Sequence, residues 1–227
     1  MTINNDLYDN YGRVIRPVLF NTAKDGSGTW YFALLDSDGH LQVDALSIAA
    51  GTNRIGKVMA DIHEVRVSKA IDASIGAYTA GDVVNDDDCS VTATCWTFAG
   101  MANAVGGQGA VLGATLINET ENQAVQYELI LFNATPTGEL TDNSANTNPV
   151  LADRAKWVGT ISFPASVAGG ATVATTTQAS PSTLGKLPLF YKCAAASTTL
   201  LGVLITKTAY TQTATDDIEI ALQVEHF

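Results

Sequence analysis

The chain has 227 residues, of which 46% are hydrophobic and 15% are charged, and its 12 basic and 23 acidic side chains give a net charge of −11. This composition excludes a largely disordered chain and allows a sizeable core. Nucleic-acid binding needs clusters of Lys and Arg that neutralise phosphates. The densest basic stretch, residues 54–69, is interrupted by Asp61 and Glu64, so neither DNA nor RNA is an expected partner.

The first residues do not resemble a targeting segment. The stretch MTINNDLYDNYGR has no cationic start and no apolar core, so it does not read as a signal peptide. No run of about 18 apolar residues occurs, so no membrane span is expected. We therefore expect synthesis in a cytoplasm and no membrane partner.

The first third of the chain predicts short strands and one tight turn. Residues 14–20 (VIRPVLF) and 29–35 (TWYFALL) are apolar runs typical of strands. Asp38-Gly39 lies between two apolar runs, and Asp-Gly supplies the positive φ angles of a hairpin turn. A calcium loop is the alternative for DSDG, but His40 occupies the place of the next oxygen ligand.

A candidate contact surface lies in this first third. Trp30, Tyr31 and Phe32 are consecutive, and consecutive side chains of a strand point to opposite faces. At least one of the three rings is therefore expected to be exposed or covered by a partner. Leu41 and Val43, which follow the predicted turn, complete the candidate interface.

Residues 47–72 mix glycine turns with short apolar stretches and are interpreted as an extended connector or arm. The sequence thus predicts two regions. Residues 1–68 form an N-terminal arm or small β-region that anchors the protein. Residues 69–227 form the main domain.

The sequence of the main domain predicts a series of consecutive strands. Its apolar and Thr/Val-rich runs are separated by Gly, Asn, Asp and Pro, which favours an all-β fold. Helix signals are weak, and the best is one short turn opened by Pro149. We expect an antiparallel β-sandwich, with a jelly roll as its candidate topology. The runs are 109–118, 125–133, 156–163, 198–207 and 218–227.

No metal or cofactor site is predicted. The cluster Asn85-Asp86-Asp87-Asp88 offers oxygen ligands for Ca²⁺, but a solvated loop is the favoured interpretation. The odd number of cysteines argues against a disulfide framework and favours buried thiols. The histidines show no metal-binding spacing and are expected at the surface or on edge strands. They are His40, His63 and His226, and the cysteines are Cys89, Cys95 and Cys193.

No catalytic set is predicted either. The chain lacks a GxSxG elbow, and its many carboxylates give no reason to select a glycosidase pair. GGQG at 106–109 lacks the Lys and Ser or Thr of a phosphate-binding loop and is interpreted as a turn. Core packing accounts for most aromatic residues of the main domain. We therefore expect a protein that is not an enzyme.

Three stretches resemble a group of bacteriophage virion proteins: residues 36–46, most of 71–163, and 191–227. In those proteins a strand ends in LxLFxxxPT and is followed by a Thr/Asp-Asn stretch, and the last strands read GxLYGVL…AYTPxxxxDLxxxL. The matching residues here are Leu131-Phe132, Pro136-Thr137, Asp142-Asn143, Leu201-Gly202-Val203-Leu204 and Ala209-Tyr210-Thr211.

The resemblance implies an auxiliary, decoration or head-fibre protein of the virion, made in the host cytoplasm. Its implied partners are the major capsid protein or neighbouring virion subunits. A homo-oligomer is expected, with a trimer first because capsid junctions offer local threefold sites. Two alternatives remain open: a tail- or fibre-associated host-adhesion module that binds carbohydrate, and a hydrolase such as a depolymerase.

Overall fold

A computed structural model describes residues 61–86, 95–121, 123–170 and 174–227, together with the backbone of four short strands before them. The chain forms two compact units, Met1–Lys57 and Val58–Phe227.

The first unit contains two antiparallel strand pairs. β1 (Leu7–Tyr8) pairs with β2 (Val14–Ile15), and β3 (Leu19–Asn21) pairs with β4 (Trp30–Phe32). The predicted strand at 14–20 is therefore two strands, and the stretch between them contains Pro17, which lacks the N–H that a ladder uses.

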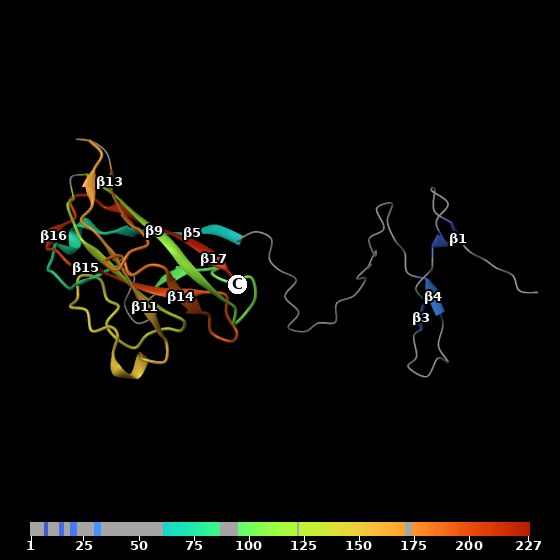
Figure 1. Ribbon diagram of the computed structural model, residues 1–227. Coiled ribbons are helices and arrows are strands. Elements are labelled where there is room, and N and C mark those ends of the chain that lie inside the picture. The colour runs from blue at the N-terminus through green and yellow to red at the C-terminus, as the bar shows by residue number, and fades with distance from the viewer. Residues whose placement is uncertain are drawn as a thin grey trace, which may run out of the picture. The chain divides into compact units, whose positions relative to one another are not determined.

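The second unit is almost entirely β (Figure 1). Its described residues contain thirteen strands and two short 3₁₀ turns, η1 (Ala73–Ile75) and η2 (Leu151–Asp153). The strands are β5 (Asp61–Ile71), β6 (Ala77–Tyr78), β7 (Val83–Val84), β8 (Trp96–Phe98), β9 (Gln108–Glu121), β10 (Tyr127–Phe132), β11 (Trp157–Phe163), β12 (Val167–Ala168), β13 (Ala174–Ala179), β14 (Leu189–Lys192), β15 (Leu200–Thr206), β16 (Tyr210–Thr211) and β17 (Asp216–His226).

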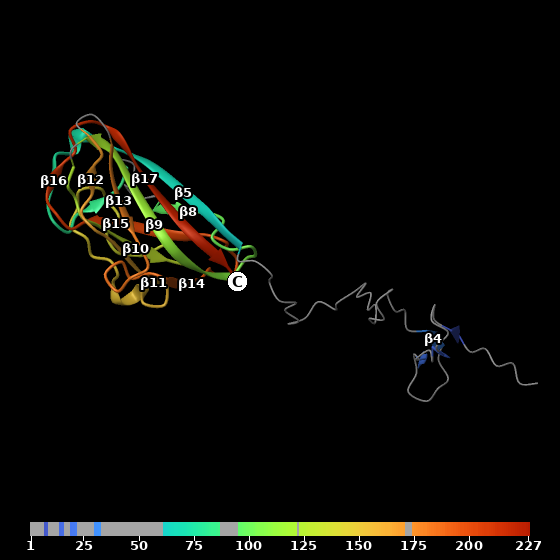
Figure 2. The same cartoon turned by 45° about the horizontal axis from the view of Figure 1, so that its top comes forward.

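Two antiparallel sheets form a sandwich. The six-stranded sheet has the order β12-β13-β9-β17-β5, and β14 also pairs with β9. The five-stranded sheet has the order β11-β10-β15-β7, and β8 also pairs with β15. The small pair β16-β6 completes the described strands of this unit. Figure 2 shows the long strands β5, β17 and β9 side by side, as their registers require.

The predicted all-β antiparallel sandwich is confirmed, and the jelly-roll topology stays a prediction. The sandwich begins earlier than residue 69, because β5 pairs with β17 from Asp61 onward. The segment interpreted as a connector is therefore a full strand over residues 61–71. The predicted turn near Pro149 is η2, and the 164–186 stretch contains β12 and β13.

The main core lies between the sheets and follows from alternation along the strands. On β10, Tyr127, Leu129 and Leu131 are fully buried and belong to the main cluster. Glycine is required at one point of close packing: a Cβ at Gly202 would come within 2.8 Å of Leu129 Cδ1. The largest fully buried side chains are Trp96, Tyr78, Tyr127, Phe98, Phe132, Ile71, Met101, Leu116, Leu129, Leu131, Ile161 and Leu200.

A second apolar cluster lies on the outer face of the five-stranded sheet. It contains five buried side chains, against which the partly buried Leu140 packs. Leu140 comes from the connection between β10 and β11, residues 133–156, which we call the covering loop. The buried members of this outer cluster are Val83, Ile130, Phe132, Val203 and Ile205.

Two buried carboxylates hold the covering loop. Asp142 accepts hydrogen bonds from the Tyr78 hydroxyl at 2.9 and 3.0 Å and from the Asn85 main-chain N–H at 2.8 Å. Asp153 accepts from the main-chain N–H of Thr137 at 2.6 Å and pairs with the Lys156 ammonium at 2.9 Å. The loop is thereby fixed without regular secondary structure beyond η2.

The outer face of the six-stranded sheet is polar. Arg66 on β5 pairs with Glu64 on the same strand and with Glu219 on β17. One register step away, the Ser68 hydroxyl donates to Asp217 at 3.0 Å. These side chains are exposed or half-exposed, so this face is a solvated surface.

Candidate functional site

β11 and β14 lie next to each other (Figures 1 and 2). Three aromatic side chains on or near these strands are exposed. Trp157 on β11 is 47% exposed, Phe190 on β14 is 66% exposed, and Phe227 just after β17 is 50% exposed. The Phe190 and Phe227 ring centroids are 6.2 Å apart. Together these residues form what we call the aromatic surface.

Local strand geometry explains why these rings face outward. The β10–β11 register passes from Leu131–Gly159 to Phe132–Trp157, which leaves Val158 as an extra residue. Such a bulge shifts the side-chain alternation, so Trp157 does not continue the inward row of Ile161. On β14, Phe190 points out because its neighbour Tyr191 is buried in the core.

A shallow groove of about 310 Å³ runs along the aromatic surface. Its polar groups are the Asn133 amide, which donates to the Lys192 carbonyl at 3.3 Å, and the Lys192 side chain. None of the described residues that line it is a carboxylate, and its ring faces and hydrogen-bond donors suit stacking and hydrogen bonding. The groove is lined by Asn133, Trp157, Val158, Phe190, Tyr191 and Lys192.

A second hollow, of about 490 Å³, surrounds Glu128 on β10. Its carboxylate pairs with Lys186 at 3.0 Å and Lys207 at 3.1 Å and accepts from the Ser162 hydroxyl at 3.0 Å. Burial acts to raise the pKa of Glu128, but these three donors outweigh it and lower the pKa below its usual value. The carboxylate is therefore an ionised, neutralised group, unsuited to act as a general acid.

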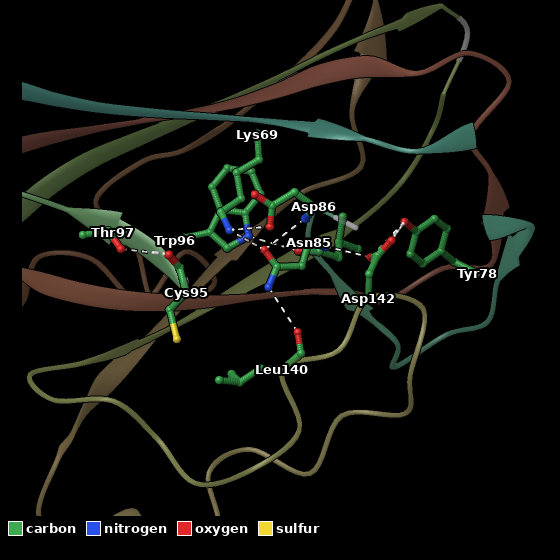
Figure 3. Close-up of polar contacts among 10 residues, drawn as sticks. Lys69, Tyr78, Asn85, Asp86, Cys95, Trp96, Thr97, Leu140 and Asp142 are labelled. Carbon is green, nitrogen blue, oxygen red and sulfur yellow. Dashed lines mark hydrogen bonds and ion pairs between the residues drawn. The ribbon is translucent and has the colours of Figure 1, made fainter. Parts of the chain in front are cut away.

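The third candidate is a buried polar centre at the junction of β5, β7 and the covering loop (Figure 3). The Lys69 amine lies 2.6 Å from Asn85 Oδ1 and 2.8 Å from Asp86 Oδ1. Asn85 connects this group to Asp142, which binds Tyr78. Burial and the neighbouring Asp142 charge raise the pKa of Tyr78, which keeps its hydroxyl a hydrogen-bond donor.

Of the cluster considered as a calcium site, the structure describes Asn85 and Asp86. Asn85 is 2% exposed and therefore does not belong to the solvated loop expected there. Asn85 Oδ1 and Asp86 Oδ1 both accept from the Lys69 ammonium, whose positive charge opposes binding of a cation there. Asp87 and Asp88 lie outside the described residues. Within the described ranges, no group of three or more His, Cys, Asp or Glu side chains is placed to hold a metal ion.

The cysteine prediction is confirmed for two of the three residues. Cys95 and Cys193 are buried free thiols, and burial raises the pKa of each. A raised pKa leaves less of each thiol in the reactive thiolate form at neutral pH. Cys89 lies outside the described part of the chain.

His63 lies on the edge strand β5, as expected, whereas His226 on β17 is buried between two strands and differs from the prediction. The His63 and His226 ring centroids lie 3.9 Å apart, and His226 is buried. His226 Nδ1 lies 2.6 Å from Asn103 Oδ1, and His63 Nε2 lies 3.0 Å from the Gly100 carbonyl oxygen. The pair fixes the 99–104 turn against β5 and β17. His40 falls outside the described residues.

The predicted contact surface is only partly described. Trp30, Tyr31 and Phe32 form β4, whose backbone pairs with β3, while their side chains lie outside the description. Leu41 and Val43 also lie outside it. Sequence reasoning missed the aromatic surface because it assigned the aromatic residues of the main domain mostly to the core. The adjacent pair Phe190-Tyr191 carried the missed signal, since only one of the two rings can point inward.

Comparison with protein-family models gives no match, and no curated protein matches the chain. In the described segments, no helix is long and apolar enough to cross a bilayer.

Proposed function

We propose that this protein is a non-enzymatic structural component of a bacteriophage virion that binds the capsid or neighbouring virion subunits. The observation that carries the binding role is the aromatic surface, where three large exposed rings lie close together on the sandwich. Contiguous exposed apolar residues on a folded domain are typical of interaction sites. Trp157 belongs to a residue type that often contributes a large share of the binding energy at protein interfaces.

The resemblance to virion proteins supports the same role. The residues that carry it do structural work here: Phe132 belongs to the outer cluster, Asp142 holds the covering loop, and Gly202 allows close packing in the core. The resemblance to virion proteins therefore lies at positions that determine the fold. The two compact units suit a protein whose first unit anchors it while the sandwich contacts neighbours.

Covering the aromatic surface would supply useful binding energy. Burial of one half-exposed ring removes on the order of 100 Å² of apolar area from water. Each ring would thus contribute about 2–3 kcal/mol of binding free energy before the costs of association are subtracted. A specific interface of standard size buries about 1,200–2,000 Å², so further surface must join the three rings. A homo-oligomer, with a trimer first, would provide that area at a capsid junction.

The deciding experiment is a cryo-electron-microscopy map of the purified particle that carries this chain. We expect sandwich density repeated over the outer shell, with Trp157 and Phe190 at a contact. Absence of the chain from purified particles would overturn the virion role. Density at a tail or fibre tip would overturn capsid decoration.

A variant pair tests the contact itself. Trp157→Ala with Phe190→Ala should abolish binding of the full chain to emptied shells, measured by co-sedimentation. Leu184→Ala is the matched control, because Leu184 is 87% exposed and lies outside the aromatic surface. Equal binding of the double variant and the control would show that this surface is not the contact.

One observation favours carbohydrate binding as a second candidate. Trp157 and Phe190 line a groove together with Asn133 and Lys192, which combines ring faces for stacking with hydrogen-bond donors. A glycan array with the same variants tests it. Sugar-specific retention that is lost in the Trp157 and Phe190 double variant favours host adhesion, whereas no retention of the native chain removes this candidate.

A further inference from the structure

Lys69 is a buried amine at a place where a lysine is unexpected. It lies on β5 in the inward row with Val65 and Ile71 and is 8% exposed. Lysine is rarely buried, since its charge must then be paired. Here the amine is directed at a side-chain amide, with Nζ 2.6 Å from Asn85 Oδ1.

The Asn85 amide is held in one orientation. Asn85 is 2% exposed, and its Nδ2 donates to the Leu140 carbonyl of the covering loop at 3.1 Å. Its Oδ1 accepts from Lys69 and also from the Asp86 main-chain N–H at 3.1 Å. The Asp86 main-chain N–H stays on the amide oxygen when Lys69 attacks, so it polarises the carbonyl and makes the Asn85 Cγ more electrophilic.

A carboxylate and an aromatic wall complete the group (Figure 3). Asp86 Oδ1 lies 2.8 Å from Lys69 Nζ, and the Asp86 side chain is 34% exposed, so protons can exchange with solvent there. The Lys69 amine lies 5.8 Å from the Trp96 ring centroid. The Trp96 indole N–H donates to the Val84 carbonyl at 3.0 Å, which fixes the ring beside the amine.

We propose that Lys69 and Asn85 join in an intramolecular isopeptide bond, with Asp86 as the proton carrier. This inference is independent of the proposed function. The Lys69 amine lies within hydrogen-bond reach of both the amide that it would attack and the carboxylate that would take its proton. Such preorganisation replaces a bimolecular encounter by an intramolecular step.

The reaction needs no co-reactant. The Asp86 carboxylate takes a proton from the Lys69 ammonium, and the freed amine attacks Asn85 Cγ to form the C–N bond. As the Cγ–Nδ2 bond breaks, Nδ2 takes up the surplus proton of the attacking nitrogen, and ammonia leaves. The ammonia then takes the proton of Asp86 and departs as ammonium. A secondary amide joins the two side chains, and Asp86 is a carboxylate again.

The bond would connect the two sheets. Lys69 belongs to β5 of the six-stranded sheet, and Asn85 follows β7 of the five-stranded sheet directly. The cross-link would thus do the work of an inter-sheet disulfide, whereas the described cysteines, Cys95 and Cys193, are free. A covalent link of this kind restricts the unfolded chain in the way a disulfide does.

Intact mass spectrometry of the denatured full chain tests the proposal. We expect the native protein to be lighter than its sequence by one ammonia. Trypsin should no longer cut after Lys69, so a peptide spanning residues 67–154 should appear, also lighter by one ammonia. A native protein of full sequence mass that is cut after Lys69 overturns the proposal.

Three variants assign the loss to this chemistry. Lys69→Arg keeps the positive charge but should restore the full mass, as should Asp86→Asn, which removes the proton carrier. Lys207→Arg alters an exposed lysine paired with Glu128 and should keep the loss of ammonia. Asparagine also loses ammonia when it closes on its own backbone, so a loss that persists in Lys69→Arg overturns the cross-link.

Discussion

The outer faces of the two sheets have opposite character. The face of the six-stranded sheet carries Arg66, Glu219 and Asp217 in hydrogen-bonded contact with their neighbours and with solvent. The face of the five-stranded sheet carries the outer cluster, whose five side chains are at most 5% exposed. The outer face of the six-stranded sheet is therefore a polar surface in contact with solvent. The outer face of the five-stranded sheet is instead covered by a further layer, the covering loop.

The difference shows how a loop without regular structure is held in place. The outer cluster supplies apolar area. In addition, Asp142 joins the covering loop to Tyr78 and Asn85 outside it, and Asp153 joins Thr137 and Lys156 within it. A buried polar group without a partner costs more than a made hydrogen bond contributes. The loop therefore depends on its anchors as much as on its apolar contact.

Phe132→Ala should have the largest effect, because it empties the centre of the outer cluster. We expect the free energy of unfolding to fall by about 4 kcal/mol, as for other buried phenylalanines. Urea unfolding followed by tryptophan fluorescence measures it. Ile62→Ala, on the polar face where Ile62 is 57% exposed, should change stability by less than about 0.5 kcal/mol. Similar losses of unfolding free energy in both variants would mean that the outer cluster contributes no more to stability than the polar face does.

Asp142→Ala should follow, with a loss of about 3 kcal/mol, because the Tyr78 hydroxyl and the Asn85 N–H lose their acceptor inside the protein. The released loop should expose the outer cluster, so a fluorescent hydrophobic dye should bind below the unfolding midpoint. Asp217→Ala is the control, since its partner Ser68 is exposed and can bond to water. Dye binding by the control alone would contradict the anchoring role of Asp142.

Acid should loosen the covering loop through Asp153. Burial acts to raise the pKa of Asp153, but the Lys156 ammonium and the Thr137 donors outweigh it and lower the pKa below its ordinary value of 3.8. A lowered folded-state pKa gives stability that is present above 3.8 and is lost as the pH falls through the folded-state pKa. Asp153→Asn should flatten this acid slope in pH-dependent urea unfolding. An unchanged slope would assign the acid sensitivity elsewhere, with Glu128→Gln as the next variant.

Arg66→Ala should have the smallest effect. Its ion pairs with Glu64 and Glu219 lie on the solvated face, where water and salt replace them at little cost. We expect an unchanged thermal midpoint in calorimetry, even at low salt. A clear drop would mean that the polar face is a coupled structural layer.

The two sheets were predictable from the sequence, but the layer that the covering loop adds outside the five-stranded sheet was not. Alternation in 125–133 and 218–227 is explicit, so β10 and β17 follow from period and turn residues. β5 was interpreted as part of a connector. Its inward row contains Lys69, and the burial of this lysine depends on Asn85 and Asp86, which the pattern does not place beside it. The outer cluster was not predicted, because Ile130 and Phe132 are apolar residues on the face that a two-layer sandwich leaves exposed to solvent.

The candidate site shows the same limit. Trp157 faces outward only because Val158 is a bulge, and a bulge is set by the partner strand. The exposure of Phe227 depends on its place beside Phe190, far away in the chain. Composition and strand periodicity say nothing about either contact.

The place of β17 also bears on how the protein is made. β17 follows all the other described strands, yet it lies between β9 and β5 in the six-stranded sheet. Until β17 has been synthesised, β9 and β5 present open edges of the kind that invite pairing with other chains. The sandwich can close only after synthesis of that strand, through contacts of long sequence separation that form slowly. Lower growth temperature or a chaperone that shields strand edges should therefore raise the yield of folded protein.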